Sequence, residues 1–165
     1  VGSIVASSYA IGLDGLLNYY KHDDSMFEPE MAEAFYAHAK FDDCFAKPYV
    51  VRGSEMLLDK LGSDAYKGIT ATAPGFYAPQ GRQVRLETRI EDINSLLSSF
   101  EYSGNRVLNF EMETSAIYGL SRLLGHNALT MCLIIANRAT GTFLNNYKPN
   151  MNELIEKTLY NIRCM

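Results

Sequence analysis

Residues 109–124 constrain the fold of this chain more than any other segment, because a short apolar strand ending near Phe110 passes there directly into an amphipathic helix. Glu111 and Glu113 stand at the corner between the two. The simpler interpretation is that the helix dipole favours acids in a first turn. Side chains at such a corner can also face the crevice beyond the strand's carboxyl end, where open α/β sheets bind ligands, and carboxylates there suit vicinal hydroxyl groups.

The helix after this corner has apolar residues at helical spacing. We expect them to form a buried stripe that holds the first turn rigidly. They are Met112, Ala116, Leu120 and Leu123. Gly125, just beyond the helix, predicts a left-handed cap.

Strand-like and helical segments alternate along the rest of the chain. Apolar and β-branched runs predict strands at residues 4–10, 49–51, 66–73, 106–110 and 128–136. Helical spacing predicts helices at residues 29–41, 55–61, 90–100 and 151–162. The alternation predicts an α/β fold, a three-layer sandwich whose central sheet is largely parallel or mixed.

The last predicted strand, residues 128–136, is a nearly unbroken apolar run, which is typical of a central strand covered on both faces. In the final helix, the residues expected to form a buried stripe are Leu154, Ile155, Leu159 and Ile162. Asp14 and Gly15 predict a turn. Residues 21–25 predict an exposed loop in which His22 faces solvent.

Composition narrows the class of protein. A chain of 165 residues with 47% hydrophobic and 21% charged residues has room for one globular domain with a substantial core, and we expect a single domain over residues 1–165. The net charge of -4, with no basic run, argues against nucleic-acid binding. The three cysteines, Cys44, Cys132 and Cys164, show no C-x-x-C spacing, which fits a reducing cytoplasm better than a disulfide framework or a zinc site. The apolar runs are shorter than the roughly 18 residues of a membrane span.

Three segments, in chain order, resemble motifs of the uridine phosphorylase branch of the nucleoside phosphorylase family. The loop at residues 76–82, FYAPQGR, resembles the base-recognition loop, in which an aromatic pair precedes Gln-x-Arg. The EMETSA segment after the Asn-Phe strand end resembles the ribose-binding segment. Arg138, after the IIAN strand end, resembles the arginine that closes the base pocket. The resemblance covers most of the chain and implies a nucleoside phosphorylase-like fold.

The resemblance also implies roles for these positions. Gln80 offers an amide that donates and accepts, and Arg82 a fixed cation, which together match the carbonyl, N–H and carbonyl along a uracil edge. The implied substrate-binding residues are Phe76, Gln80, Arg82, Glu111, Met112, Glu113 and Arg138. The implied catalytic residues are Arg82, Glu113 and Arg138. We expect the loops that carry them to end strands of one sheet and to converge.

The implied activity is that of a pentosyltransferase, the reversible phosphorolysis of uridine to uracil and ribose 1-phosphate. It needs no metal or organic cofactor, because phosphate is the co-substrate. Asn137 stands where purine-specific relatives carry an Asp that can deliver a proton, and an amide cannot act as a general acid at ordinary pH. Uridine is therefore the favoured substrate. A purine nucleoside phosphorylase, a nucleosidase of the same fold and a non-catalytic nucleoside-binding protein remain alternatives.

The chain begins with Val1 and enters a predicted strand almost at once. Together with the resemblance, this predicts the C-terminal larger part of a longer polypeptide, because the family's phosphate-binding glycine loop and arginines belong to a segment before Val1. We therefore expect the 165-residue chain to be inactive by itself. Nucleoside and phosphate are the expected partners. The family's dimers and hexamers imply a homo-oligomer, which the cysteine pattern places in the cytoplasm.

Overall fold

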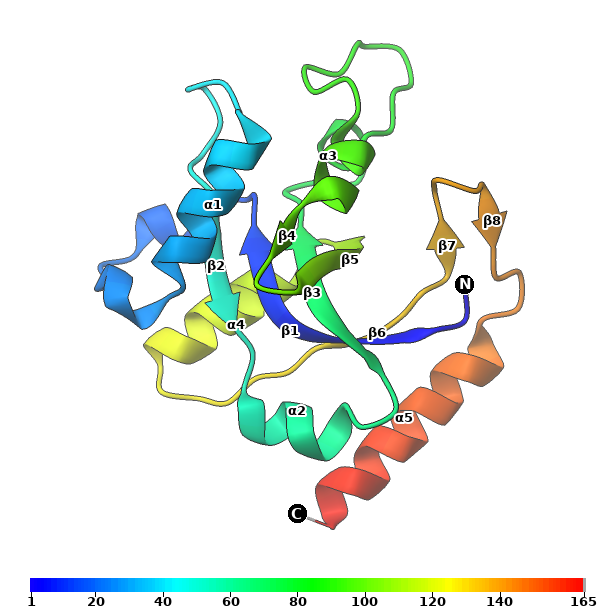
Figure 1. Ribbon diagram of the computed structural model, residues 1–165. Coiled ribbons are helices and arrows are strands. Elements are labelled where there is room, and N and C mark those ends of the chain that lie inside the picture. The colour runs from blue at the N-terminus through cyan, green and yellow to red at the C-terminus, as the bar shows by residue number, and fades with distance from the viewer. Residues whose placement is uncertain (165) are drawn as a thin grey trace.

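The computed structural model describes residues 1–164, which form a curled sheet with helices on both faces (Figure 1). The strands are β1 (Ile4–Gly12), β2 (Tyr49–Arg52), β3 (Tyr66–Thr72), β4 (Glu101–Tyr102), β5 (Asn105–Glu111), β6 (Met131–Leu133), β7 (Ala136–Asn137) and β8 (Thr142–Phe143). The α-helices are α1 (Pro29–Ala39), α2 (Glu55–Leu61), α3 (Ile93–Ser99), α4 (Thr114–Leu123) and α5 (Lys148–Arg163). Short 3-10 turns occupy η1 (Leu16–Tyr19), η2 (Asp24–Met26) and η3 (Ala78–Gln80).

The sheet is mixed, as the sequence predicts. Its strand order is β2-β1-β3-β5-β4, and β6 lies beside the first residues of β1. The central strands β1, β3 and β5 are parallel, whereas β2, β6 and β4 run antiparallel to their neighbours. Thr72 pairs with Glu111, so the carboxyl ends of β3 and β5 lie side by side. This register brings the loops after these two strands together.

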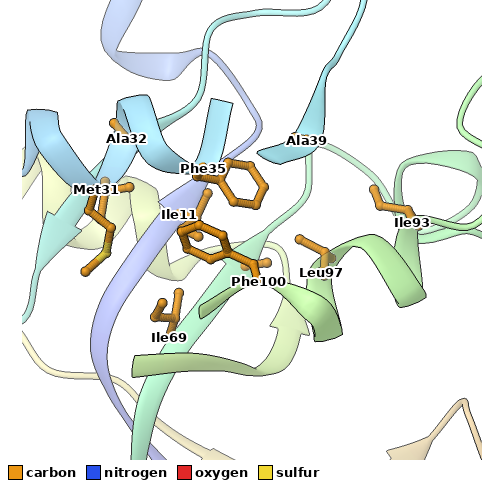
Figure 2. Packing of buried hydrophobic residues seen from close by; sticks show 11 residues of the cluster. Ile11, Met31, Ala32, Phe35, Ala39, Ile69, Ile93, Leu97 and Phe100 are labelled. Atoms are coloured by element: carbon orange, nitrogen blue, oxygen red, sulfur yellow. The ribbon is translucent and has the colours of Figure 1, made fainter. Parts of the chain in front are cut away.

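Alternating side chains of the strands feed a core on each face of the sheet. Ile11 points to the side of α1 and α3, where the Phe35 and Phe100 rings meet edge to face with centroids 5.0 Å apart (Figure 2). The next residue back, Ala10, belongs to the opposite face, where it packs with Tyr118 of α4. Helices therefore cover both faces, which confirms the predicted three-layer arrangement.

The buried side of α4 differs from the predicted stripe. Of the residues predicted to be buried, Met112 is exposed, and Ala116, Leu120 and Leu123 are partly exposed. The residues that are buried are Thr114, Ser115, Tyr118 and Gly119. At Gly119 the helix packs closely against η1, because an added Cβ would lie 3.0 Å from the Leu17 side chain. The predicted left-handed cap after this helix is confirmed, since Gly125 has a φ of 71°.

The apolar run at residues 128–136 does not form the long, doubly covered strand that the sequence predicts. Its part in the sheet is β6, which pairs with Ile4–Ala6 of β1, and Ile135 is 46% exposed. Residues Tyr9–Gly12 of β1 are paired with β2, so the two strands share the β1 edge and β6 begins only at Met131, opposite Ala6. The last residue of the run, Ala136, belongs to β7, which pairs with β8 in a separate hairpin.

The predicted stripe of the final helix is also mostly uncovered. Leu154 is buried, but Ile155, Leu159 and Ile162 are 48%, 52% and 49% exposed. The elements that α5 contacts, α2 and β6, cover little of its apolar side. The prediction of four buried residues is therefore wrong for three of them.

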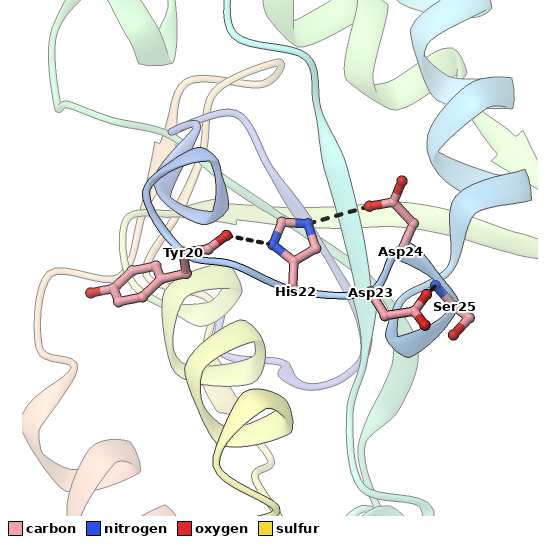
Figure 3. Close-up of polar contacts among 5 residues, drawn as sticks. All are labelled: Tyr20, His22, Asp23, Asp24 and Ser25. Atoms are coloured by element: carbon pink, nitrogen blue, oxygen red, sulfur yellow. Dashed lines mark hydrogen bonds and ion pairs between the residues drawn. The ribbon is translucent and has the colours of Figure 1, made fainter.

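Residues 20–25 fold around the His22 ring, which Figure 3 shows between Tyr20 and Asp24. Its Nδ1 lies 2.9 Å from the Tyr20 carbonyl oxygen and its Nε2 lies 3.3 Å from Asp24 Oδ1. The ring packs edge-on against Phe27, and the side chain is only 19% exposed. The predicted exposed loop is confirmed, and His22 taken as a whole residue is exposed with it. Its ring, however, is turned onto its own loop by these contacts.

Candidate functional site

The acidic corner lies where β5 ends and α4 begins. The Glu111 carboxylate accepts hydrogen bonds at its Oε2 from the backbone N–H groups of Glu113 (2.7 Å) and Thr114 (2.8 Å). Its Oε1 accepts a hydrogen bond from the Thr72 hydroxyl at 2.5 Å. The first N–H groups of a helix have no partner inside it, and a carboxylate both satisfies them and complements the helix dipole. Glu111 therefore caps α4, and three of about four acceptor positions of its carboxylate are in use.

Glu113 has a different environment from Glu111. It is the N-cap residue of α4, and its side chain is exposed. Its Oε2 accepts a hydrogen bond from the Met112 N–H at 3.2 Å. Because its backbone N–H is bonded to Glu111, Glu113 presents a mostly uncommitted carboxylate from a fixed piece of backbone.

The loop at residues 76–82 contains the turn η3 and meets both other predicted segments. Gln80 is buried to 3% exposure, and its Nε2 donates to the Glu111 carbonyl oxygen at 3.4 Å. Its Oε1 accepts hydrogen bonds from Arg82 Nη1 at 2.7 Å and from Arg138 Nη2 at 2.5 Å. Arg138 also donates to the Gln80 carbonyl oxygen. The structure thus brings the three predicted segments together, although Arg138 lies in the turn between β7 and β8 and does not follow a strand of the main sheet.

The aromatic residue of this loop is already in contact with a cation. The Arg82 guanidinium lies over the Phe76 ring, 3.5 Å from its centroid, and donates to the Phe76 carbonyl oxygen at 2.5 Å. Phe76 is 51% exposed. Arg82 covers one face of the Phe76 ring in a cation–π contact. A sugar or base can therefore stack only on the opposite face of the ring unless Arg82 moves.

The two guanidiniums form a concentrated positive charge. Burial lowers the pKa of Arg82, and burial together with the charge of Arg82 lowers the pKa of Arg138. Arginine keeps its proton in proteins, so the lowered pKa means that the cations have lost part of their hydration. In the described part of the chain, the hydrogen bonds of both groups run to neutral oxygen atoms of Phe76 and Gln80. Such a pair favours binding of an anion or of a group that becomes negative.

Asn137 closes a turn next to this cluster. Its Oδ1 accepts the backbone N–H groups of Ala139 at 3.0 Å and Thr140 at 3.2 Å. These contacts occupy the amide oxygen, and the NH2 group that remains is not acidic at ordinary pH. Arg138 lies within the same turn, so Asn137 helps to orient it.

Sequence reasoning missed a set of polar side chains behind the acidic corner. Asp14 accepts hydrogen bonds from the Leu16 N–H (2.7 Å), the Tyr49 hydroxyl (3.0 Å) and the Ser115 hydroxyl (2.6 Å). Burial raises the pKa of Tyr49 well above its usual value. In the sequence, Asp14 signals only a turn, since Tyr49 and Ser115 lie 35 and 101 residues away. No local pattern could have revealed this connection.

A polar cleft of about 510 Å³ lies at the other end of α4, away from these residues. Arg52, Tyr118, Arg122 and His126 are among the residues that line it. Arg122 donates to backbone carbonyl oxygens of Met26 and Arg52, so its guanidinium is engaged in holding the fold.

Features of other kinds of site are not found in residues 1–164. This part of the chain brings no three His, Cys, Asp or Glu side chains close enough to hold a metal ion. None of its helices is both long and apolar enough to cross a membrane. The three cysteines are free thiols.

Comparison with known proteins identifies the family. A model described as the phosphorylase superfamily matches residues 1–159, so the chain belongs to the phosphorylase superfamily. A uridine phosphorylase of Thermococcus kodakarensis is 34% identical over 91 residues, which is 52% of this chain and 30% of that protein.

Solved structures show the same fold. A Trypanosoma brucei nucleoside phosphorylase, described as showing uridine phosphorylase activity, has a TM-score of 0.78 at 23% identity and matches 99% of this chain and 58% of its own. The Schistosoma mansoni uridine phosphorylase has a TM-score of 0.60 at 21% identity, with 98% and 55% matched. The chain thus spans little more than half the length of these two proteins. The likeness confirms the predicted nucleoside phosphorylase-like fold.

Proposed function

We propose that the protein carrying this chain is a uridine phosphorylase, a pentosyltransferase that moves the ribosyl group of uridine to phosphate and releases uracil. One observation carries the proposal: Gln80, Arg82 and Arg138 form a single cluster that also touches the acidic corner through the Glu111 carbonyl oxygen. The similarity to uridine phosphorylases supports the same assignment.

The cluster suits a pyrimidine base that leaves as an anion. Uracil presents a carbonyl, an N–H and a second carbonyl in sequence, and the Gln80 amide with a neighbouring guanidinium can match that edge. The Gln80 Oε1 is shared by Arg82 and Arg138. We infer that a base exchanges for one of these contacts, so that a guanidinium turns from a neutral amide to an oxygen that gains negative charge. Stabilisation that grows in the transition state is the kind that accelerates a reaction.

The acidic corner suits the ribose. Glu113 is exposed and has an uncommitted oxygen, so we assign it to the ribose hydroxyl groups. Glu111 is assigned mainly to holding the corner, and its remaining acceptor position can take a hydroxyl as well. Met112 lies between them and is 39% exposed, which leaves its side chain free to contact the sugar.

The proposed reaction is a displacement at C1′ of the nucleoside. A phosphate oxygen forms a bond to C1′ while the bond from C1′ to the base nitrogen breaks, and the electron pair of that bond leaves with the base. Positive charge develops on the sugar beside the Glu113 carboxylate, and negative charge develops on uracil beside Arg82 and Arg138. This bond exchange involves no change of oxidation state and needs no added cofactor. The proposal assigns no residue of this chain to phosphate binding.

The setting of the enzyme is part of the same proposal. We place it in pyrimidine salvage in the cytoplasm, with the free thiols of the three cysteines as support. Homo-oligomer formation is supported by apolar side chains of α5 that are about half exposed, among them Ile155, Leu159 and Ile162. The measured mass in solution tests this last point.

The test is an activity assay on the polypeptide encoded by the whole open reading frame. Uridine, inosine and thymidine are each incubated with and without phosphate, and free base and ribose 1-phosphate are measured. The proposal expects uracil release that depends on phosphate and exceeds hypoxanthine release. Base release without phosphate would indicate a nucleosidase, preferred cleavage of inosine a purine nucleoside phosphorylase, and binding of uridine without turnover a nucleoside-binding protein.

A further inference from the structure

Thr72 joins the two strands and the helix that form the acidic corner. It is the last residue of β3, lies opposite Glu111 and is 1% exposed. Its Oγ1 donates to Glu111 Oε1 at 2.5 Å and accepts the backbone N–H of Ser115 at 2.9 Å. The hydroxyl therefore uses its single donor and one of its acceptor positions on the corner itself.

These contacts close a ring of hydrogen bonds around the backbone of Glu113. From Thr72 the ring passes to the Glu111 carboxylate, then to the N–H groups of Glu113 and Thr114, and returns through the N–H of Ser115. The Glu113 side chain itself has a weaker local contact, with the Met112 N–H at 3.2 Å. The position of the Glu113 carboxylate thus depends on the backbone that the ring holds.

A second anchor keeps α4 in place without Thr72. The Ser115 hydroxyl donates to Asp14 Oδ2 at 2.6 Å, and Asp14 is held in turn by the Tyr49 hydroxyl. The Tyr118 hydroxyl, one turn later in α4, donates to the Ser7 carbonyl oxygen of β1 at 2.7 Å. Loss of the Thr72 hydroxyl therefore loosens the corner while the rest of the helix stays docked on the sheet.

We propose that Thr72 is a positioning residue, which fixes the Glu113 carboxylate at the ribose through the Glu111 carboxylate and the start of α4. This inference rests on the proposed function, because it assigns Glu113 to the sugar. A carboxylate that must meet two hydroxyl groups tolerates little displacement, so a supporting hydrogen-bond ring has a direct effect on sugar binding.

The same strand offers a matched control. Thr70 is fully buried, two residues before Thr72 and on the same face of β3. Its Oγ1 donates to Asn109 Oδ1 at 2.7 Å and lies 2.5 Å from the Ser7 hydroxyl, and these contacts do not involve α4. Thr70→Val and Thr72→Val therefore each remove one buried hydroxyl group, at positions two residues apart on the same strand.

The experiment compares Thr72→Val, Thr72→Ser and Thr70→Val in the polypeptide encoded by the whole open reading frame. Unfolding midpoints and dissociation constants for uridine and for uracil are measured for each. Thr72→Val should weaken uridine binding at least tenfold, an effect of one lost hydrogen bond to a charged group, with uracil binding changed less than threefold. Thr72→Ser should restore uridine binding, and Thr70→Val should lower the unfolding midpoint without changing the ratio of the two dissociation constants.

A double-mutant cycle with Glu113→Gln provides the second readout. If Thr72 acts through Glu113, Thr72→Val should reduce kcat/KM less than twofold in the Glu113→Gln background. Independent, multiplicative losses would overturn the inference, as would equal losses of uridine and uracil binding in Thr72→Val. Should Thr72→Val fail to fold, Thr72→Ala enters the same cycle. Failure of the parent protein to bind or cleave uridine would instead contradict the proposed function, and the two failures are thereby distinguished.

Discussion

Replacing Glu113 by Gln should separate its role from that of Glu111, although both acids stand at the same corner. The Glu113 side chain is exposed and accepts a hydrogen bond from the Met112 N–H at 3.2 Å, which an amide oxygen can also accept. The loss of a charge near a helix N-terminus is worth about 0.5 kcal/mol. We therefore expect the melting temperature to fall by no more than about 2 °C.

The effect on activity should be much larger. A hydrogen bond from a hydroxyl to a carboxylate contributes about 1.5–3 kcal/mol, and the carboxylate also faces the positive charge that develops on the sugar. Replacing it by a neutral amide should lower kcat/KM for uridine by about tenfold to hundredfold. We therefore expect Glu113→Gln to have a catalytic defect and a nearly normal stability.

Glu111→Gln is the matched comparison. The Glu111 carboxylate accepts two backbone N–H groups and the Thr72 hydroxyl, so with an amide in its place either a backbone N–H or the Thr72 hydroxyl proton loses its acceptor. A mismatch of this kind costs about 1–3 kcal/mol, which corresponds to about 3–9 °C in melting temperature for a domain of this size. The assay pairs thermal unfolding with uracil release from uridine for both variants. Unchanged activity in Glu113→Gln, or equal destabilisation by both substitutions, would refute the division of roles.

Three further substitutions test other parts of the structure. Arg82→Ala should lower kcat/KM for uridine by about tenfold to hundredfold while ribose 1-phosphate binding stays nearly unchanged; if both are lost together, Arg82 has a structural role. Asn137→Asp should not create strong inosine cleavage, because Gln80 and Arg82 still present partners for uracil, and a large gain in hypoxanthine release would contradict this reasoning. Tyr118→Phe should reduce the free energy of unfolding by about 2–4 kcal/mol, measured by urea denaturation, because the hydroxyl donates to the Ser7 carbonyl oxygen and accepts the backbone N–H of Thr130. An unchanged urea midpoint would show that these two backbone groups find other partners.

Local signals in the sequence predicted much of the fold. The helix at Glu55–Leu61 has the predicted bounds, because Ser54 caps its start and Gly62 follows its end. The strands β1, β3 and β5 lie within two residues of their predicted ends. These elements depend on turn residues, caps and apolar periodicity, which a short window of sequence contains.

Other features depend on contacts between distant residues, and there the sequence was misleading. The buried side of α4 is set by the close approach of Gly119 to Leu17 and by the hydrogen bond from Ser115 to Asp14, and apolar periodicity registers neither contact. The apolar run at residues 128–136 has the composition of a central strand, yet β1 offers it only a short stretch of free edge. Apolar content predicts burial but not which edge or face is available.

The site shows the same division. The resemblance predicted Gln80, Arg82 and Arg138 as a group, and the structure brings them into contact. It did not indicate that the Gln80 amide oxygen is shared by both arginines, or that the Thr72 hydroxyl is bonded to the acidic corner. Both facts follow from hydrogen bonds between residues on different loops and strands, for which short motifs carry no information.

A crystal structure of the protein with uridine bound is the most direct test of the central claim. The account predicts that the uracil edge lies against Gln80, that Arg82 or Arg138 has turned from the Gln80 amide to a base oxygen, and that the Glu113 carboxylate meets the ribose hydroxyl groups. Uridine bound in the polar cleft beside Arg122, with the contacts between Gln80 and both arginines intact, would contradict it.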